Sequence, residues 1–166
     1  TFDVVEKYQG IPVQSKSGHS FIKDKMREHN AVYGGEMSAH HYFRDFSYCD
    51  SGMIPWLLVV SVLSETGQSL SSLVEEMITK FPCSGEINFK VAETQITIQK
   101  LFDHFANQNP SIDHTDGVSL DFGAWRFNVR ASNTEPLLRL NIETRLDQHP
   151  KPMQDYVDEL TRLIQN

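Results

Sequence analysis

Apolar residues recur at helical spacing along five segments of the chain. Phe21–His29 predicts a short surface helix that turns Ile22 and Met26 inward. Ile54–Leu63 is apolar on nearly all sides, which predicts a buried helix. The third segment begins at Ser69, whose hydroxyl is a preferred N-cap. The last two predicted helices cover Thr94–Asn107 and Met153–Ile164.

Alternation of apolar and polar residues, the strand pattern, is concentrated in the second half. The strands predicted there cover Glu86–Val91, Val118–Phe122, Trp125–Arg130 and Leu137–Glu143. With their helices they give the order β-α-β-β-β-α, typical of a small α+β unit whose antiparallel sheet carries helices on one face. In the first half, shorter strand-like pieces at Val4–Tyr8, Ile11–Gln14 and Ala31–Gly35 indicate a truncated α/β unit.

The segment Phe81–Gly85 separates the two halves. Pro82 ends the preceding helix, and Ser84–Gly85 makes a flexible joint. We therefore expect an α/β unit over residues 1–81 and an α+β unit over residues 86–166. The chain also lacks an initiator Met, which suggests a fragment or a processed form.

Composition and charge narrow the possible function classes. The formal charge is −7, from 15 basic and 22 acidic residues without a Lys/Arg tract, so we expect no nucleic-acid partner. The longest apolar run, Met53–Val60, is too short to cross a membrane and contains Pro55, so we expect no membrane partner. Cys49 and Cys83 lack the spacing of a metal site or a disulfide framework, which favours inert thiols in a reduced, cytoplasmic protein.

The densest cluster of hydrogen-bond donors is Arg130–Pro136, between two predicted strands. Arg130 can hold an anion with two N–H groups. The residues that follow add short donors and exposed backbone amides: Ser132, Asn133 and Thr134. A dianionic phosphate needs this combination of charge and converging donors. An ordinary polar turn is the alternative, and composition alone favours it slightly because such loops are common.

A second polar cluster follows a pair of glycines. Glu36, Ser38 and His40 alternate, so an extended segment would turn all three to one side. A carboxylate, a hydroxyl and an imidazole suit the recognition of neighbouring sugar hydroxyls, and His40 can also move protons near neutral pH. The alternatives are a polar loop and, less favoured, a metal site at His40 and His41, since no further Cys/His cluster supports zinc. His19, before a short helix, is by itself more typical of a structural histidine.

Both clusters resemble motifs of one family. Gly35–His40 resembles the sugar-recognition loop of the α-D-phosphohexomutases, and Arg130–Pro136 resembles the phosphate-binding loop in their last domain. The order and separation of the motifs match, as do Gly18–Ser20 upstream and Asp116–Val118 before the second loop. The segments Gly35–Phe46 and Asp50–Gly52 look most like the bacterial phosphomannomutase branch. The resemblance covers nearly the whole chain, and the two motifs together are specific where either alone is weak.

The resemblance implies a fold and an activity. Enzymes of this family have four domains around one cleft, and this chain looks like the latter part of the α/β domain three followed by the α+β domain four. The implied reaction interconverts mannose 6-phosphate and mannose 1-phosphate through a phosphoserine enzyme and a bisphosphate intermediate, for GDP-mannose and polysaccharide synthesis. The serine loop and the Mg²⁺-binding Asp-x-Asp-x-Asp loop belong to the missing part, so we expect the fragment alone to be inactive. Its implied partners are a hexose phosphate and the N-terminal domains of the same enzyme.

The resemblance also implies roles for single residues. The clamp on the non-reacting phosphate consists of Arg130, Ser132, Asn133 and Thr134. Glu36 and Ser38 bind sugar hydroxyls, and His19 assists. His40 stands where the family has a candidate general acid or base, and no residue of this chain is expected to bind the metal. Three alternatives stay open: a phosphoglucomutase or dual-specificity mutase, a non-catalytic sugar-phosphate-binding module, and a structural interaction domain.

Overall fold

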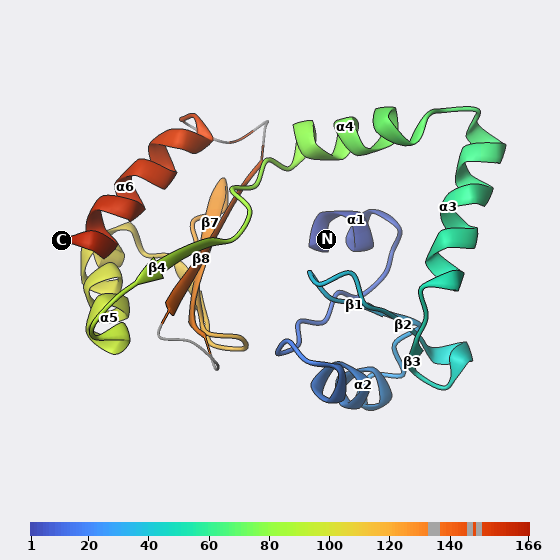
Figure 1. The fold of residues 1–166 in the computed structure, drawn as a ribbon, viewed down its shortest axis with the longest axis horizontal. Coiled ribbons are helices and arrows are strands. Elements are labelled where there is room, and N and C mark those ends of the chain that lie inside the picture. Colours follow the sequence, from blue (N-terminus) through green and yellow to red (C-terminus); the bar gives the residue numbers. More distant parts are fainter. Residues whose placement is uncertain (133–136, 146–147, 149–150) are drawn as a thin grey trace. The chain divides into compact units, whose positions relative to one another are not determined.

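The computed structural model describes residues 1–132, 137–145, 148 and 151–166. The chain divides into two compact units, Thr1–Gly67 and Gln68–Asn166 (Figure 1). Both units combine helices with antiparallel sheets. The fold class predicted from the sequence, α/β followed by α+β, is therefore confirmed.

The N-terminal unit contains a small antiparallel sheet. Its strands, in spatial order, are β1 (Tyr33–Gly35), β2 (His41–Phe43) and β3 (Cys49–Asp50). Its helices are α1 (Phe2–Lys7), α2 (His19–Glu28), the 3-10 turn η1 (Arg44–Phe46) and α3 (Met53–Thr66). The helix predicted over Phe21–His29 is confirmed as α2.

The strand predicted at Val4–Tyr8 is wrong, because this segment forms most of α1. Asp3 lies in the first turn of α1 and Lys7 in its last turn, where each charge interacts favourably with the helix dipole. Residues 11–14 form no regular element. Neither segment joins the three-stranded sheet, and a strand without a partner would leave its backbone N–H and C=O groups unpaired.

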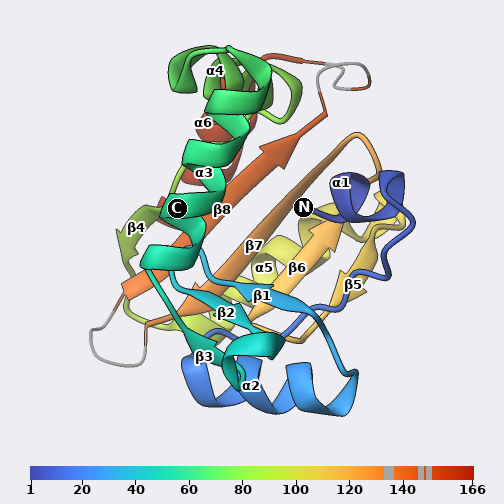
Figure 2. The ribbon, with the colours of Figure 1, turned by 90° about the vertical axis from the view of Figure 1, so that its right-hand side faces the viewer.

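Helix α2 packs directly against β1 because Gly34 has no side chain (Figure 2). A Cβ atom at position 34 would lie 2.7 Å from Met26 Sδ and 3.0 Å from Ile22 Cγ2. Ile22 and Met26 are buried together with Tyr42, which pairs with Gly34 across β1 and β2. This small core fixes the helix against the strand that leads into the turn at Glu36.

The long apolar helix of this unit is exposed. No residue of α3 is buried, and Trp56, Leu57 and Leu58 are 57%, 55% and 55% exposed. The helix predicted over Ile54–Leu63 is confirmed, but the prediction that it is buried is wrong for this chain. The pattern reports that every side of the helix is apolar, whereas burial depends on other segments that cover those sides.

The C-terminal unit begins with α4 (Leu70–Lys80) and contains a five-stranded antiparallel sheet. Its strands are β4 (Ile87–Lys90), β5 (Ser111–Asp113), β6 (Val118–Asp121), β7 (Trp125–Ala131) and β8 (Leu137–Thr144). Their spatial order is β4-β8-β7-β6-β5. One face is covered by α5 (Thr94–Phe105), which continues into the 3-10 turn η2 (Ala106–Gln108), and by α6 (Met153–Gln165) (Figure 1). The predicted order β-α-β-β-β-α is confirmed, and the short edge strand β5 is added to it.

Alternation along β7 separates the two faces of this sheet. The residues that join the core beneath the helices are Trp125, Phe127 and Val129. The residues between them lie on the opposite face, which is polar: Arg126, Asn128 and Arg130. On β8, Arg139 lies opposite Arg130 in the strand register. The register therefore places two guanidinium groups side by side on the polar face.

Residues 82–85, the predicted domain boundary, are hydrogen-bonded to β8. Ser84 N–H donates to the Ile142 carbonyl at 2.9 Å, and Thr144 N–H donates to the Pro82 carbonyl at 2.9 Å. Ile142 N–H in turn donates to Ser84 Oγ at 2.9 Å. The division into compact units falls earlier, between Gly67 and Gln68. The exact domain boundary stays a prediction.

Helix α4 begins where its capping residue predicts. Ser72 N–H donates to Ser69 Oγ at 3.1 Å, which is the expected N-cap bond.

Among the described residues, no single helix is long and apolar enough to cross a membrane, and only α3 and α4 taken together reach that length and hydropathy.

Candidate functional site

The predicted sugar-recognition residues lie in the tight turn between β1 and β2. Glu36 N–H donates to the His40 carbonyl at 2.9 Å, and Ala39 N–H donates to the Glu36 carbonyl at 3.1 Å. Ala39 adopts the left-handed conformation, with a φ of 63°, that closes the turn. The structure thus brings Glu36, Ser38 and His40 together, although by a turn rather than by the extended segment that their alternation predicted.

Hydrogen bonds join these three side chains into one network. Ser38 Oγ lies 3.0 Å from Glu36 Oε2 and 2.9 Å from His40 Nδ1. The second carboxylate oxygen, Glu36 Oε1, accepts a bond from Tyr42 Oη at 2.5 Å. Glu36 is half-buried, whereas Ser38 and His40 are exposed. The network therefore runs from the interior of the unit to its surface, where a polar ligand can reach it.

Two tyrosines of this hairpin form hydrogen bonds on opposite faces of the sheet, and only Tyr42 bonds to a residue of the turn. Tyr42 is fully buried, and burial together with its bond to Glu36 raises the pKa of its phenol. On the other face, Tyr33 Oη lies 2.6 Å from His41 Nδ1, and burial raises the pKa of Tyr33 as well. Both phenols stay protonated at neutral pH. The sequence interpretation missed Tyr42 because nothing in the local sequence marks an aromatic residue as a hydrogen-bonding partner of the turn.

His19, the other residue predicted to contact the sugar, is exposed at the first position of α2. The preceding Gly18 has a φ of 123°, a conformation that L side chains rarely adopt. Among the contacts of the described residues, no hydrogen bond or ion pair links His19 to Glu36 or Ser38. Its role in sugar binding stays a prediction.

The predicted phosphate-binding residues lie at the end of β7, where the structure describes Arg130 and Ser132. Asn133 and Thr134 lie outside the described residues. Arg130 Nη2 lies 3.4 Å from Glu86 Oε2, and Arg130 Nη1 lies 3.5 Å from Asp116 Oδ2. Both contacts are longer than the roughly 2.7–2.9 Å of a well-formed charge-assisted bond. The guanidinium therefore keeps much of its capacity to donate to another anion.

A second arginine, which the sequence interpretation missed, lies beside the first. Arg139 Nη1 lies 3.6 Å from Glu86 Oε2, and Arg139 Nη2 donates to Ser132 Oγ at 3.5 Å. Its Nε is buried and has no hydrogen-bond partner among the described residues. Only the register of β7 and β8 reveals this pairing, because Arg130 and Arg139 lie on opposite sides of the loop in the sequence.

A glycine allows Asp116 to approach Arg130. Gly117 has a φ of 72°, and a Cβ atom there would lie 2.5 Å from the Val129 carbonyl oxygen and 2.6 Å from Arg130 Cβ. Only glycine fits both the conformation and the space. The carbonyl of Asp116 also accepts a bond from Asn128 Nδ2 at 2.8 Å. The turn singled out in the sequence at Asp116–Gly117 is therefore part of the surroundings of Arg130.

No group of three or more His, Cys, Asp or Glu side chains that could hold a metal ion occurs in the part of the chain that the structure describes. The described residues therefore offer no set of ligands that fits the Mg²⁺ implied by the family resemblance. Its assignment to a segment outside this chain stays a prediction. Cys49 and Cys83 are both free and exposed.

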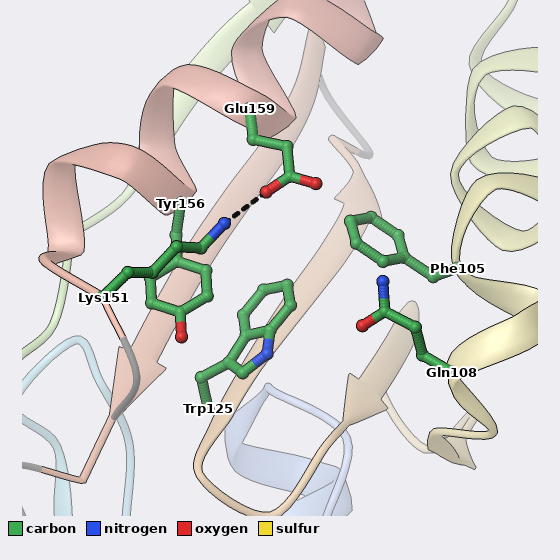
Figure 3. Close-up of a pocket in the computed structure, with 6 residues that line it drawn as sticks. All are labelled: Phe105, Gln108, Trp125, Lys151, Tyr156 and Glu159. Carbon is green, nitrogen blue, oxygen red and sulfur yellow. Dashed lines mark hydrogen bonds and ion pairs between the residues drawn. The ribbon is translucent and has the colours of Figure 1, made fainter. Parts of the chain in front are cut away.

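A separate hollow of about 170 Å³ lies between α6, the end of α5 and β7 (Figure 3). Figure 3 shows the rings of Phe105, Trp125 and Tyr156 along its wall. At its edge, Lys151 Nζ forms an ion pair with Glu159 and lies 4.3 Å from the centre of the Tyr156 ring. The residues predicted to bind sugar or phosphate do not line this hollow.

Two family models match the chain. Residues 1–81 match the model described as "Phosphoglucomutase/phosphomannomutase, alpha/beta/alpha domain III", and residues 86–160 match "Phosphoglucomutase/phosphomannomutase, C-terminal domain". The chain belongs to the phosphoglucomutase/phosphomannomutase family. This membership confirms the phosphohexomutase resemblance carried by the two loops.

The chain is also similar to individual members of this family. It is 63% identical over 147 residues to "Phosphohexose mutases" of Xanthomonas campestris pv. campestris (strain B100), which covers 89% of this chain and 33% of that protein. It is 55% identical over 165 residues to "Phosphomannomutase" of Vibrio cholerae serotype O1. This match covers 99% of this chain and 35% of that protein. It is 54% identical over 147 residues to "Phosphomannomutase" of Escherichia coli (strain K12). This match covers 89% of this chain and 32% of that protein. The chain thus spans about a third of the length of these relatives.

A solved structure from the same family has the same fold. A phosphoglucomutase/phosphomannomutase family protein from Burkholderia thailandensis matches with a TM-score of 0.72, over 97% of this chain and 34% of that chain. Its sequence is 24% identical, so the likeness shows the fold alone. The roles of single residues in this family member stay predictions that rest on sequence and geometry.

Proposed function

We propose that this chain supplies the sugar-recognition and phosphate-recognition parts of a phosphomannomutase. Such an enzyme interconverts mannose 6-phosphate and mannose 1-phosphate through a phosphoserine enzyme and a bisphosphate intermediate, and serves GDP-mannose and polysaccharide synthesis. The observation that carries the proposal is the pairing of Arg130 and Arg139 at the ends of β7 and β8, beside Ser132. Relatives named phosphomannomutase support the choice of mannose.

The paired guanidinium groups suit a phosphate dianion. Like charges directly opposite each other on a sheet are destabilising, and Glu86 offsets this by lying 3.4 Å from Arg130 and 3.6 Å from Arg139. The two arginine side chains are only 24% and 28% exposed, so an anion that reaches them interacts through a lower dielectric than bulk water. A dianion with several acceptor oxygens can use the remaining N–H donors of both groups.

The turn from Glu36 to His40 suits sugar hydroxyl groups. The Glu36 carboxylate accepts hydrogen bonds, and the Ser38 hydroxyl both donates and accepts them. We therefore assign these two residues to the sugar, with His19 as an assisting contact. His40 is the candidate general acid or base, because its imidazole is exposed and histidine is the side chain that most often transfers protons in catalysis.

The rest of the proposal concerns segments outside this chain. Covalent phosphoryl transfer needs a nucleophile, here the phosphoserine, so this chain alone is inactive. Mg²⁺ offsets charge on the transferring phosphoryl group when it is bound, and no residue of this chain is assigned to it. The partners are a hexose phosphate and the N-terminal domains of the same enzyme. Two free thiols fit a reducing, cytoplasmic environment.

The test is turnover by the full-length mutase that contains this chain. We expect magnesium-dependent interconversion of the two mannose phosphates, and no turnover by this chain alone. Faster turnover of glucose phosphates would identify a phosphoglucomutase or a dual-specificity enzyme instead. Binding of hexose phosphates without turnover by the full-length protein would identify a non-catalytic binding module. Turnover by the isolated chain would contradict the assignment of the nucleophile to another segment.

A further inference from the structure

The hydrogen-bond network around Glu36 contains one member that a sugar cannot touch. Tyr42 is fully buried, and its ring packs with Ile22 and Met26 beneath α2. Its hydroxyl nevertheless donates to Glu36 Oε1 at 2.5 Å. This hydrogen bond between a buried phenol and a half-buried carboxylate connects the core of the N-terminal unit to the predicted sugar contact.

We infer that Tyr42 is a positioning residue for the sugar site. It anchors one oxygen of Glu36 and thereby orients the hydrogen-bonded side chains of Glu36, Ser38 and His40. The inference rests on the proposed function, in which Glu36 and Ser38 bind sugar hydroxyls. It adds to that function a residue outside both recognition loops and a defined proton position on His40.

The proton position follows from counting donors. An ionised carboxylate only accepts hydrogen bonds, so the 3.0 Å contact between Glu36 Oε2 and Ser38 Oγ uses the single hydroxyl hydrogen of Ser38. The 2.9 Å contact between Ser38 Oγ and His40 Nδ1 then requires the imidazole to donate from Nδ1. The other ring nitrogen, Nε2, is left as the atom of His40 that accepts or releases a proton toward a ligand.

The anchoring follows from strand geometry. Tyr42 pairs with Gly34 across β1 and β2, and Glu36 follows the end of β1, so the phenol and the carboxylate belong to one hairpin. Tyr42 holds Glu36 Oε1 and Ser38 holds Oε2. With both oxygens engaged, the carboxylate is oriented before any ligand arrives, and less conformational freedom is lost on binding.

The same hairpin offers a matched control. The phenol of Tyr33 is hydrogen-bonded as well, but to an imidazole, at 2.6 Å from His41 Nδ1, and on the opposite face of the sheet from Tyr42. Among the described hydrogen bonds, none connects Tyr33 with Glu36, Ser38 or His40. Tyr33→Phe therefore removes a comparable hydroxyl group without touching the network.

The first measurement compares kinetic constants of the full-length mutase. We expect Tyr42→Phe to raise KM for the hexose phosphate about three- to tenfold, the effect of losing one orienting hydrogen bond, with a smaller change in kcat. Inhibition by inorganic phosphate should stay unchanged, because phosphate alone does not use the sugar turn. Tyr33→Phe should leave both constants unchanged. Equal KM effects in the two variants would overturn the inference.

The second measurement asks whether Tyr42 acts through Glu36. In the Glu36→Ala background, adding Tyr42→Phe should raise KM no further, because the side chain that Tyr42 anchors is gone. A full additional effect in the double variant would overturn the inference in favour of a purely structural role. Nitrogen NMR of the histidine-labelled enzyme should show His40 protonated at Nδ1 in its neutral form. Protonation at Nε2 would overturn the proposed donor order.

Failure of the inference can be told apart from failure of the proposed function. If Glu36→Ala raises KM while Tyr42→Phe does not, the sugar role of the turn stands and the positioning role is wrong. If neither Glu36→Ala nor Tyr42→Phe changes KM, the turn does not bind the sugar and both are wrong. Thermal unfolding of each variant is measured alongside, and a loss of stability in Tyr42→Phe with unchanged KM would also overturn the inference.

Discussion

The two units of the chain hold their parts of the predicted site by different means. In the C-terminal unit, Arg130 and Arg139 stand on a sheet whose core contains fourteen buried hydrophobic residues among those described. In the N-terminal unit, Glu36 follows a sheet whose core has three such residues among those described: Ile22, Met26 and Tyr42. The arginine pair is therefore held chiefly by packing, whereas the sugar turn is held chiefly by hydrogen bonds and by the close approach at Gly34.

This difference predicts different sensitivities. A well-filled core is stabilised by many contacts, so the loss of one surface contact changes it little, while the loss of a central side chain is severe. A unit with little buried apolar surface is marginally stable, so it depends on each contact that remains. We therefore expect the C-terminal unit to lose most stability when a core residue is substituted. The N-terminal unit should lose stability when a single polar residue or glycine is substituted.

The largest effect is expected from a core substitution in the C-terminal unit. Phe127 is fully buried, with its ring centre 5.4 Å from that of Phe105 and 5.7 Å from that of Trp125. Phe127→Ala should lower the free energy of unfolding of this unit by about 3–5 kcal/mol, because it leaves a cavity in the core. Urea unfolding with hydrogen exchange in β7 and β8 measures this. The control, Phe46→Ala at a residue that is 51% exposed, should change stability by less than about 0.5 kcal/mol. Equal losses would contradict the comparison.

The next largest effect concerns the arginine pair. In the full-length mutase, Arg130→Ala should weaken the binding of mannose 1-phosphate by about 1.5–3 kcal/mol, roughly ten- to a hundredfold, because it removes a charge-assisted contact. Arg130→Lys should recover only part of this, since an ammonium lacks the planar fork. Arg162→Ala on α6, where the side chain is exposed, is the control. Calorimetric titration with mannose 1-phosphate and with inorganic phosphate is the measurement, and wild-type affinity for both ligands in Arg130→Ala would refute the phosphate assignment.

A smaller effect should appear at the glycine of the N-terminal unit. Gly34→Ala places a Cβ atom 2.7 Å from Met26 Sδ, the movable part of a flexible side chain, so we expect a loss of about 1 kcal/mol in stability. Gly52→Ala is the matched control, because a Cβ atom there meets nothing within 4 Å. Hydrogen exchange in α2 and β1 of both variants provides the readout. Indistinguishable protection in the two variants would show that the helix does not depend on this close approach.

The smallest effect is a pH dependence in the C-terminal unit. Burial raises the pKa of Glu159, but hydrogen bonds and charges from Lys151 and His104 lower it by more than burial raises it. The resulting pKa therefore lies below the ordinary value of 4.5. Because the folded pKa is the lower one, the stabilisation is present above the unfolded pKa and is lost as pH falls through the folded pKa. Urea midpoints should therefore fall less in Glu159→Gln than in the wild type when pH is lowered from about 6 to about 3.

Glu75→Gln on the exposed side of α4 serves as the control for this pH dependence. It should follow the wild type over the same pH range, because it leaves the Lys151–Glu159 pair intact. A wild-type pH dependence in Glu159→Gln would mean that this ion pair does not contribute to stability.

The sequence predicted those helices best whose apolar stripe matches a covered face. The stripes of α5 and α6 are buried in the C-terminal core, as expected. For α3 the pattern predicted the helix but not its exposure, because an all-apolar helix has no stripe from which a covered side can be told from an exposed one. It also failed for β5, whose three residues are too few for alternation to be distinguished from a loop.

The candidate site divides in the same way. Local composition singled out Glu36, Ser38 and His40, and the structure joins these three by hydrogen bonds. The sequence did not single out Tyr42 or Arg139, because their importance comes from the strand register that pairs Tyr42 with Gly34 and Arg139 with Arg130. A single sequence contains the turns that set such registers, but not the register itself, which depends on packing of the whole sheet.

The glycine at 117 has a consequence for anyone who varies or transplants this protein. A side chain there would collide with the carbonyl of Val129 and with Arg130 Cβ, which are fixed parts of β7 and not movable side-chain ends. In a library randomised at this position and selected for phosphate binding, we therefore expect glycine to be recovered almost alone. A designer who grafts Arg130 onto another hairpin must therefore transfer the Asp116–Gly117 turn as well. Without that turn, the graft would keep the arginine but lose the carboxylate that lies beside it.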